Sequence, residues 1–334
     1  MDISENAEEL AREFAEDGVK YVHLNHEGAR SLSGRSLIGS GLARSDVRQW
    51  LVSMASAGYY TYKSDDGSSR LCHEDRLRSI WQAYTKGLLE VSSAGVFYSL
   101  AGPEVTEKPD YVYVILSAMG NDIFTHSLNR FYVQNYQHIG SAVGRNNWVL
   151  RVADVGGVLG SFYLPTSFNP ENANRIQALL IKVADRAGVD RRKVVIVGSS
   201  KGATGAAYHA LHLGSSMVAV DPILEDTYYE EKQKDCHFTR GGIFLEAKEH
   251  VFEKFDGSFE RDGTVRLAIT SRNSPQFNPV SSFFERLRIP VLICNDKTIK
   301  DHPDVAKVTH RIVMSIATSI MAGLPLPSQS QIVR

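Results

Sequence analysis

The sequence predicts an α/β protein in which helices cover both faces of a mostly parallel sheet. From Pro109 onward, short β-branched and aliphatic runs alternate with segments of helical spacing, which is typical of such a sheet. The 334 residues, 43% of them hydrophobic, also suffice for a sizeable core. The runs expected to form strands are 111–116, 148–152, 194–197, 217–220, 265–269 and 291–293.

Residues 1–105 lack long apolar strands and predict a small α+β accessory region. Residues 45–57 begin with a capping residue and continue with helical spacing. Residues 59–63 and 70–72 flank a polar turn and predict a hairpin. A helix and a hairpin also suit a winged-helix DNA reader, but 37 Lys and Arg residues balance 38 Asp and Glu residues, which disfavours nucleic acid. We therefore expect an accessory or lid module (1–105) beside a catalytic domain (106–325).

The most informative stretch is the turn Gly198-Ser199-Ser200-Lys201-Gly202. A buried strand precedes it and a small-residue helix follows, which is the context of a nucleophile elbow. Ser200 would sit at a strained bend, with Gly198 and Gly202 small enough for the backbone to pass. The Lys201 amide, at the start of the helix, is the expected first oxyanion donor. The alternative is an ordinary strand-to-helix turn, or one that holds a phosphate.

The remaining catalytic groups should follow other strands of the same sheet. The loop after the strand at 111–116 has small residues, and we expect the amides of Met119 and Gly120 to complete the oxyanion hole. His302 follows the final strand and is the expected general base. His310, on the next helix, is the alternative base.

The sequence leaves the acid that orients the histidine open. No carboxylate follows the penultimate strand, where the acid is usually found. Asp221, which ends the strand after the nucleophile, is our choice. Asp296 and Asp301 are nearer to His302 in sequence, and Asn273 could orient the imidazole without a charge. A Ser-His dyad would also work at a reduced rate.

Four polar residues at predicted strand ends are candidate substrate contacts. Arg151, Asp154, Tyr163 and Arg272 are expected at the edge of the sheet that holds Ser200, where open α/β sheets bind ligands. They could contact an anionic or sugar substrate. Each could instead form a structural ion pair or a cap.

The three cysteines, Cys72, Cys236 and Cys294, have no CxxC spacing, which disfavours a disulfide framework or a zinc site. Neither a signal-peptide pattern nor an apolar stretch of membrane-spanning length is present. We expect a cytoplasmic protein with no transmembrane segment and no bound metal or cofactor.

These residues resemble the α/β-hydrolase-fold proteins of bacterial capsule clusters, in particular the XcbB/CpsF type of capsular polysaccharide biosynthesis protein. The likeness lies within about residues 110–310, in RVADVGG at 151–157, SFYLPT at 161–166, GSSKG at 198–202, AVDPIL at 219–224 and DHPD at 301–304. The resemblance implies an O-acyltransferase (acetyltransferase) or esterase that acts on a glycan of a surface polysaccharide. An acyl donor such as acetyl-CoA would be the co-substrate.

The resemblance also implies roles for two residues: Ser200 would carry the acyl group, and His302 would deprotonate first the serine and then the sugar hydroxyl. The missing carboxylate after the penultimate strand departs from the usual triad. The alternative function is a non-catalytic scaffold or binding subunit of a polysaccharide assembly. The sequence leaves homo-oligomers and assembly partners open.

Overall fold

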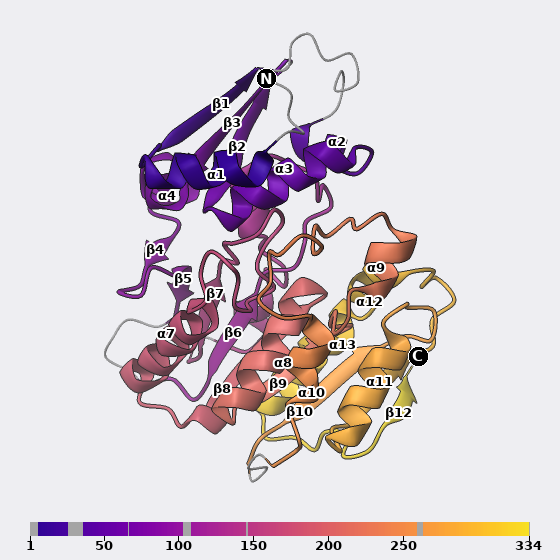
Figure 1. Cartoon of the computed structure of the whole chain (residues 1–334). Helices are drawn as coiled ribbons and strands as arrows, with labels where there is room; N and C mark the ends of the chain where they lie inside the picture. The colour runs from indigo at the N-terminus through magenta and orange to yellow at the C-terminus, as the bar shows by residue number, and fades with distance from the viewer. Residues whose placement is uncertain are drawn as a thin grey trace.

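The computed structural model describes residues 6–25, 36–65, 67–102, 108–144, 146–258 and 263–333. Within these ranges the chain forms a small and a large sheet (Figure 1). The small sheet is antiparallel, with the order β1 (Tyr21–Asn25), β3 (Ser68–His73), β2 (Tyr59–Asp65). The large sheet has the order β12 (Gln331–Val333), β11 (Val291–Cys294), β10 (Arg266–Thr270), β9 (Ser216–Val220), β8 (Val194–Ser199), β6 (Val112–Leu116), β7 (Trp148–Val152), β5 (Phe97–Ala101), β4 (Glu90–Val91).

The six strands predicted from the sequence are confirmed as β6 to β11, and they are parallel throughout. Three further strands were not predicted. β5 pairs antiparallel with β7, β4 pairs antiparallel with β5, and β12 pairs parallel with β11. The large sheet therefore extends past the predicted limits of 106–325 at both ends. These edge strands are short and partly exposed, so they lack the continuous apolar run that marks a buried strand.

Both faces of the large sheet are buried at its centre, which explains why the central strands consist mostly of apolar residues. In β6, Val112, Val114 and Leu116 face one helical layer, whereas Tyr113 and Ile115 face the other. The first layer contains α7 (Asn172–Ala187), α8 (Lys201–Leu213), α10 (Lys248–Glu253) and α11 (Phe277–Arg286). The second contains α6 (Ile139–Ala142), α12 (His302–Val308) and α13 (His310–Met321).

The N-terminal region contains the predicted helix and hairpin, seen as α3 and the pair β2–β3. Ser45 is the first residue of α3 and not its cap, because Arg44 occupies the cap position. Asp66, which the sequence places in the predicted turn, lies outside the described residues. β1 adds a third strand to the hairpin. The helices here are α1 (Ala7–Glu16), α2 (Leu37–Gly41), α3 (Ser45–Ser56), α4 (Leu77–Ile80) and α5 (Gln82–Thr85).

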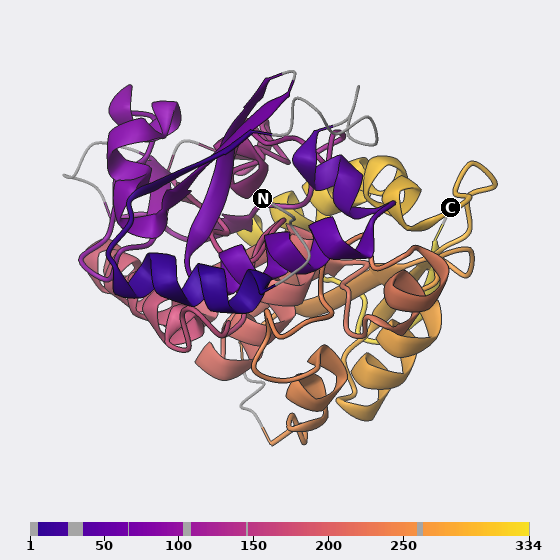
Figure 2. The same cartoon turned by 45° about the horizontal axis from the view of Figure 1, so that its top comes forward.

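The N-terminal region packs directly onto loops of the large domain (Figure 2). Trp50 and Leu51 of α3 belong to the same apolar cluster as Leu159 and Phe238. The buried guanidinium of Arg130 links the two parts as well. It donates to the carbonyl oxygen of Thr61 in β2 (2.8 Å) and to that of Val158 in the large domain (2.9 Å). The two parts therefore share one continuous packing interface.

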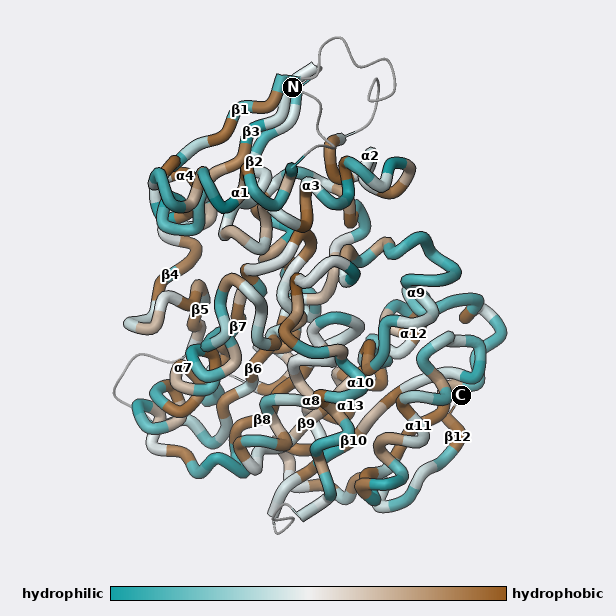
Figure 3. Tube along the Cα trace, viewed as in Figure 1, coloured by the Kyte–Doolittle hydropathy of each residue, from teal (hydrophilic) through white to brown (hydrophobic). Residues whose placement is uncertain are grey.

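The hydrophobic residues are concentrated along the strands of the large sheet, while helices such as α1 present hydrophilic surfaces (Figure 3). Across the described residues, no helix combines the length and the apolar character needed to cross a bilayer.

Candidate active site

The loops at the carboxyl ends of the parallel strands meet at one edge of the large sheet, and Ser200 lies there between β8 and α8. Its φ of 53° and ψ of −123° are rare for a residue with a Cβ atom. A Cβ atom at Gly198 would lie 2.1 Å from the Gly202 carbonyl oxygen, and one at Gly202 would lie 2.4 Å from the Leu116 carbonyl oxygen. Backbone atoms therefore occupy the space that a side chain would need at both positions, which explains why glycine stands on each side of Ser200.

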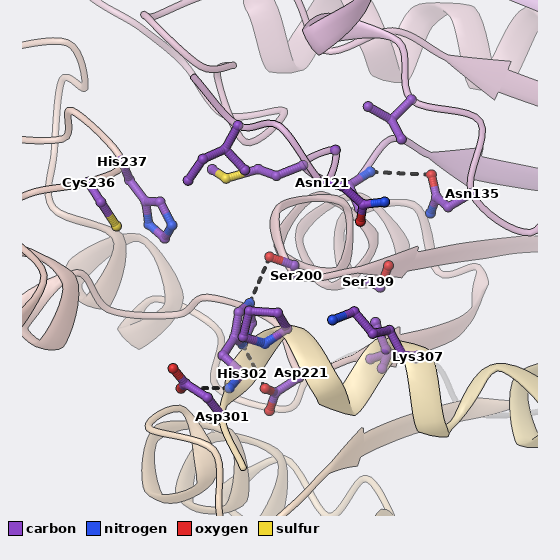
Figure 4. Close-up of a pocket in the computed structure, with 18 of the residues that line it drawn as sticks. Asn121, Asn135, Ser199, Ser200, Asp221, Cys236, His237, Asp301, His302 and Lys307 are labelled. Carbon is purple, nitrogen blue, oxygen red and sulfur yellow. Dashed lines mark hydrogen bonds and ion pairs between the residues drawn. The ribbon is translucent and has the colours of Figure 1, made fainter. Parts of the chain in front are cut away.

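Ser200, His302 and Asp221 form one hydrogen-bonded chain (Figure 4). The Nε2 atom of His302 lies 2.7 Å from the Ser200 hydroxyl oxygen, and its Nδ1 atom lies 2.7 Å from a carboxylate oxygen of Asp221. His302 and Asp221 are both buried. The three residues come from the ends of β8 and β9 and from the first turn of α12. This is the order and geometry of a nucleophile, a base and an orienting acid.

The last residue of β10 and the loop after it supply hydroxyl groups where no carboxylate is present. Thr270 and Ser274 each donate a hydrogen bond of 2.5 Å to the Asp221 carboxylate. Asp221 therefore reaches His302 from the end of β9, while Thr270 and Ser274 hold its carboxylate in place.

The other groups considered for the acid position make local contacts. Asp301 accepts from the His302 backbone amide and caps α12, and Asp296 accepts from Thr298 in an exposed turn. Asn273 donates to the Ile299 carbonyl oxygen. The alternative base, His310, stacks on Tyr136 at a centroid distance of 5.3 Å. Among these candidates, His302 is therefore the histidine that contacts Ser200, and Asp221 is the carboxylate that contacts the His302 ring.

The residues expected to stabilise an oxyanion lie around the same cavity. Met119 and Gly120 line it together with Ser200. The Lys201 amide belongs to the first turn of α8, where amides have no carbonyl partner within the helix. The Ala118 amide, just before Met119, is bound by the side chain of Asn135 at 3.3 Å. The oxyanion-hole role of the three amides stays a prediction.

The cavity beside Ser200 has a volume of about 790 Å³, large enough for a small organic substrate. Asn121, Asn135 and Lys307 line one side of Ser200, and Cys236 and His237 line the other (Figure 4). The second side also contains two adjacent tyrosines of α9 (Thr227–Lys232), Tyr228 and Tyr229.

Lys201, the residue after Ser200, is anchored by a buried ion pair. Its side chain is 0% exposed, and Nζ lies 3.1 Å from a carboxylate oxygen of Asp154 and 3.1 Å from the Leu159 carbonyl oxygen. Asp154 also accepts hydrogen bonds from the backbone amides of Phe162 and Tyr163. Burial lowers the pKa of Lys201, and the adjacent Asp154 carboxylate opposes this shift. The pair joins the first turn of α8 to the loop after β7.

The four candidate substrate contacts do not line the cavity, which corrects the sequence-based prediction. Asp154 holds Lys201, and the buried Tyr163 donates to the Val152 carbonyl oxygen at 2.9 Å. Arg151 donates to the carbonyls of Asn135 and Tyr136 and so supports the cavity wall from behind. Arg272 is exposed outside it. Arg151 and Asp154 do lie at the end of β7, but the loop that follows folds back so that Asp154 and Tyr163 are buried.

Cys72 and Cys294 are buried free thiols, and Cys236 is a partly buried one. Of the three, Cys236 lines the cavity beside Ser200. Among the described residues, no group of three or more His, Cys, Asp or Glu side chains is arranged to hold a metal ion.

Sequence reasoning missed four residues of the site: two that bind the Asp221 carboxylate and two that line the cavity. Thr270 and Ser274 were visible as hydroxyl residues after the penultimate strand, and only a carboxylate was sought there. Tyr229 and His237 lie in the segment after Asp221, which has no periodic pattern that would place it over the site.

The strand order, with the serine turn between a central parallel strand and its helix, defines an α/β-hydrolase-type fold. No protein-family model matches the chain, and no curated protein matches its sequence.

Three solved structures illustrate how distant the similar proteins are. An esterase from Pyrobaculum calidifontis is 15% identical, covering 70% of this chain and 84% of its own, with a TM-score of 0.48. A fungal esterase from Rhizomucor miehei is 13% identical, covering 75% and 91%, with a TM-score of 0.49. The glycosylation-associated protein (Gap123) complex from Streptococcus agalactiae is 14% identical, covering 76% of this chain and 50% of that chain, with a TM-score of 0.49. The assignment of the fold therefore depends on the strand order and the serine turn.

Proposed function

We propose that this protein is a serine-dependent esterase or O-acyltransferase. The observation that carries the proposal is the hydrogen-bonded chain from Ser200 through His302 to Asp221 in a substrate-sized cavity. Such a chain makes a serine hydroxyl nucleophilic, because the imidazole removes its proton while the carboxylate orients and stabilises the imidazolium.

The geometry supports a two-step reaction. His302 Nε2 takes the Ser200 proton as the hydroxyl oxygen attacks an ester carbonyl, and the oxyanion is bound by the Lys201 amide with the Met119 and Gly120 amides. The intermediate collapses to an acyl-Ser200, and the departing alcohol takes the proton from His302. In the second step His302 deprotonates either water or an acceptor hydroxyl, which attacks the acyl-enzyme and frees Ser200.

We further propose that the alcohol is part of a glycan, with a role in making or modifying a capsular or other surface polysaccharide. The proposal is supported by the resemblance of five sequence segments to XcbB/CpsF-type capsule proteins, one of which contains the Ser200 turn. For the transfer reaction an activated acyl compound such as acetyl-CoA would be the donor. Exclusion of water from the cavity would decide between transfer and hydrolysis.

A fluorophosphonate probe and p-nitrophenyl acetate hydrolysis test the proposed chemistry. We expect the wild-type protein to be labelled and to release p-nitrophenol, with both signals lost in Ser200→Ala and strongly weakened in His302→Ala. Ser199→Ala, which changes the neighbouring serine, is the matched control and should stay labelled. A folded wild-type protein that shows neither labelling nor hydrolysis would favour a non-catalytic scaffold instead.

A further inference from the structure

Two buried polar side chains on the cavity wall each have a polar atom without a hydrogen-bond partner in the described part of the chain. Tyr229 is 5% exposed and His237 is 7% exposed. The Tyr229 hydroxyl and the His237 Nδ1 atom make no hydrogen bond to any described residue. Buried polar atoms in native proteins are nearly always paired, so such atoms beside a catalytic serine call for a partner that arrives with the substrate.

The two side chains form one surface next to the catalytic base. Their ring centroids are 4.1 Å apart, and the Tyr229 ring meets the His302 ring edge-on at 5.8 Å. Figure 4 shows the His237 ring projecting from its loop toward the side of the cavity where Ser200 lies. His302 is the group that exchanges a proton with the alcohol, so a surface beside His302 is on the alcohol side of the ester.

This surface is electrically neutral. Burial lowers the pKa of His237 well below its usual value, and the nearby Lys248, His302 and Lys201 lower it further. Lys248 itself is committed elsewhere, because it pairs with Asp226 at 2.5 Å and its ammonium lies 3.8 Å from the centre of the Phe162 ring. A neutral imidazole has one donor and one acceptor in either tautomer, and a phenol hydroxyl can act as both.

We propose that Tyr229 and His237 form a subsite that hydrogen-bonds neutral hydroxyl groups on the alcohol portion of the ester. Groups that can each donate and accept match a hydroxyl, whereas a carboxylate only accepts and an ammonium only donates. The subsite therefore selects a polyhydroxylated, uncharged alcohol such as a sugar over an apolar one. This inference rests on the proposed function and assigns residues that recognise its substrate.

Two acetate esters of similar ring size test the subsite: monoacetylated glucose and cyclohexyl acetate. They share the acetyl group and differ mainly in ring oxygen and hydroxyls, and acetate release is measured for both. We expect the wild-type protein to prefer the sugar ester in kcat/KM. His237→Phe and Tyr229→Phe should each lower kcat/KM for the sugar ester about tenfold, which is the effect of one lost hydrogen bond. The kcat/KM for cyclohexyl acetate should stay within about twofold of the wild-type value.

Two further variants separate recognition from packing. His237→Asn retains a donor and an acceptor and should recover part of the loss seen in His237→Phe. Tyr84→Phe removes a phenol hydroxyl that does not line the cavity and should leave the preference between the two esters unchanged. An equal loss on both esters, or a wild-type protein that does not prefer the sugar ester, would overturn the subsite.

Hydrolysis of p-nitrophenyl acetate by the same preparations keeps the two hypotheses apart. If the wild-type protein hydrolyses this ester and the sugar preference is absent, only the subsite is wrong. If the wild-type protein hydrolyses none of the three esters and Ser200 is not labelled, the proposed function is wrong and the subsite falls with it.

Discussion

Ser200 and Asp221 both have backbone angles that residues with a side chain rarely adopt, with φ values of 53° and 49°. Such residues cost about 1–3 kcal/mol each and persist only where their surroundings hold them. Here the neighbouring strands do so, since the Ser200 amide donates to the Val220 carbonyl (2.9 Å) and the Asp221 amide to the Ile269 carbonyl (2.7 Å). The same bends turn both side chains toward His302.

The Asp221 carboxylate should matter through its charge and its contact with His302. Asp221→Asn keeps the side-chain size but weakens the stabilisation of the imidazolium and favours the wrong tautomer, so we expect kcat for p-nitrophenyl acetate to fall by about 10³–10⁴-fold. Asp296→Asn, in an exposed turn, is the control and should change kcat little. If both variants behaved alike, Asp221 would not be the orienting acid.

At the scale of elements, the site depends on how closely the start of α8 approaches β6 and β8. Gly198 and Gly202 allow this approach, and the buried pair of Lys201 and Asp154 fixes the first turn of α8 against the loop after β7. Gly160 belongs to the same arrangement, because a Cβ atom there would lie 2.5 Å from the Lys201 ammonium nitrogen.

A methyl group at Gly198 should damage the turn. Because backbone atoms of Gly202 and Ala203 occupy the space, Gly198→Ala is expected to lower the free energy of unfolding by at least about 2 kcal/mol in urea titrations. Gly140→Ala, where the new methyl would meet Val149 at an ordinary 3.7 Å, should leave stability unchanged or slightly higher. Equal stability of both variants would contradict the close approach.

Breaking the buried ion pair should be costly. Asp154→Asn leaves the Lys201 ammonium buried without a counter-charge, so we expect the free energy of unfolding to fall by about 3–5 kcal/mol. Asp75→Asn removes a carboxylate from a partly exposed pair with Lys20 and should cost less than about 1 kcal/mol. Urea titrations of the two variants compare the costs, and similar values would mean that the Lys201 pair is not structural.

At the scale of the whole molecule, the N-terminal region supports the loops that form the cavity wall. Met119 and Phe124, on the loop after β6, pack against the apolar cluster of the N-terminal helices. Ser36 caps α2 and donates to the Phe124 carbonyl oxygen at 2.7 Å. The shape of the cavity therefore depends on contacts made by residues that are far from Ser200 and His302 in the sequence.

Two histidines buried in neutral form should make the whole fold sensitive to acid. Burial lowers the pKa of His209 to about 3 and that of His237 well below its usual value. Below about pH 6.5 these histidines bind protons in the unfolded chain but not in the folded chain. Their contribution to the free energy of unfolding is therefore greatest above pH 6.5 and decreases as the pH drops toward about 3. Each histidine contributes a slope of up to about 1.4 kcal/mol per pH unit in that window.

The contribution of His209 is measured from the slope of the unfolding free energy against pH, and not from the unfolding free energy at one pH. In urea titrations between pH 4.5 and 6.5, His209→Leu should reduce the slope of the unfolding free energy against pH. The reduction should correspond to about one proton fewer taken up on unfolding. Ile196→Val, which lowers stability by removing a buried methylene, should leave the slope unchanged. An unchanged slope in His209→Leu would mean that His209 is not held neutral.

The sequence alone determined the six central strands and the bend at Ser200, because apolar runs and small-residue requirements are local properties of the chain. The choice of His302 also came from its position after the last strand. Tertiary structure decided which carboxylate meets that histidine, what holds it, and which side chains form the cavity wall. The contacts of His302 join residues 81 and 102 positions apart, and no local pattern records such pairings. Asp154 and Tyr163 show the same limit, since the loop that buries them folds back only in the folded protein.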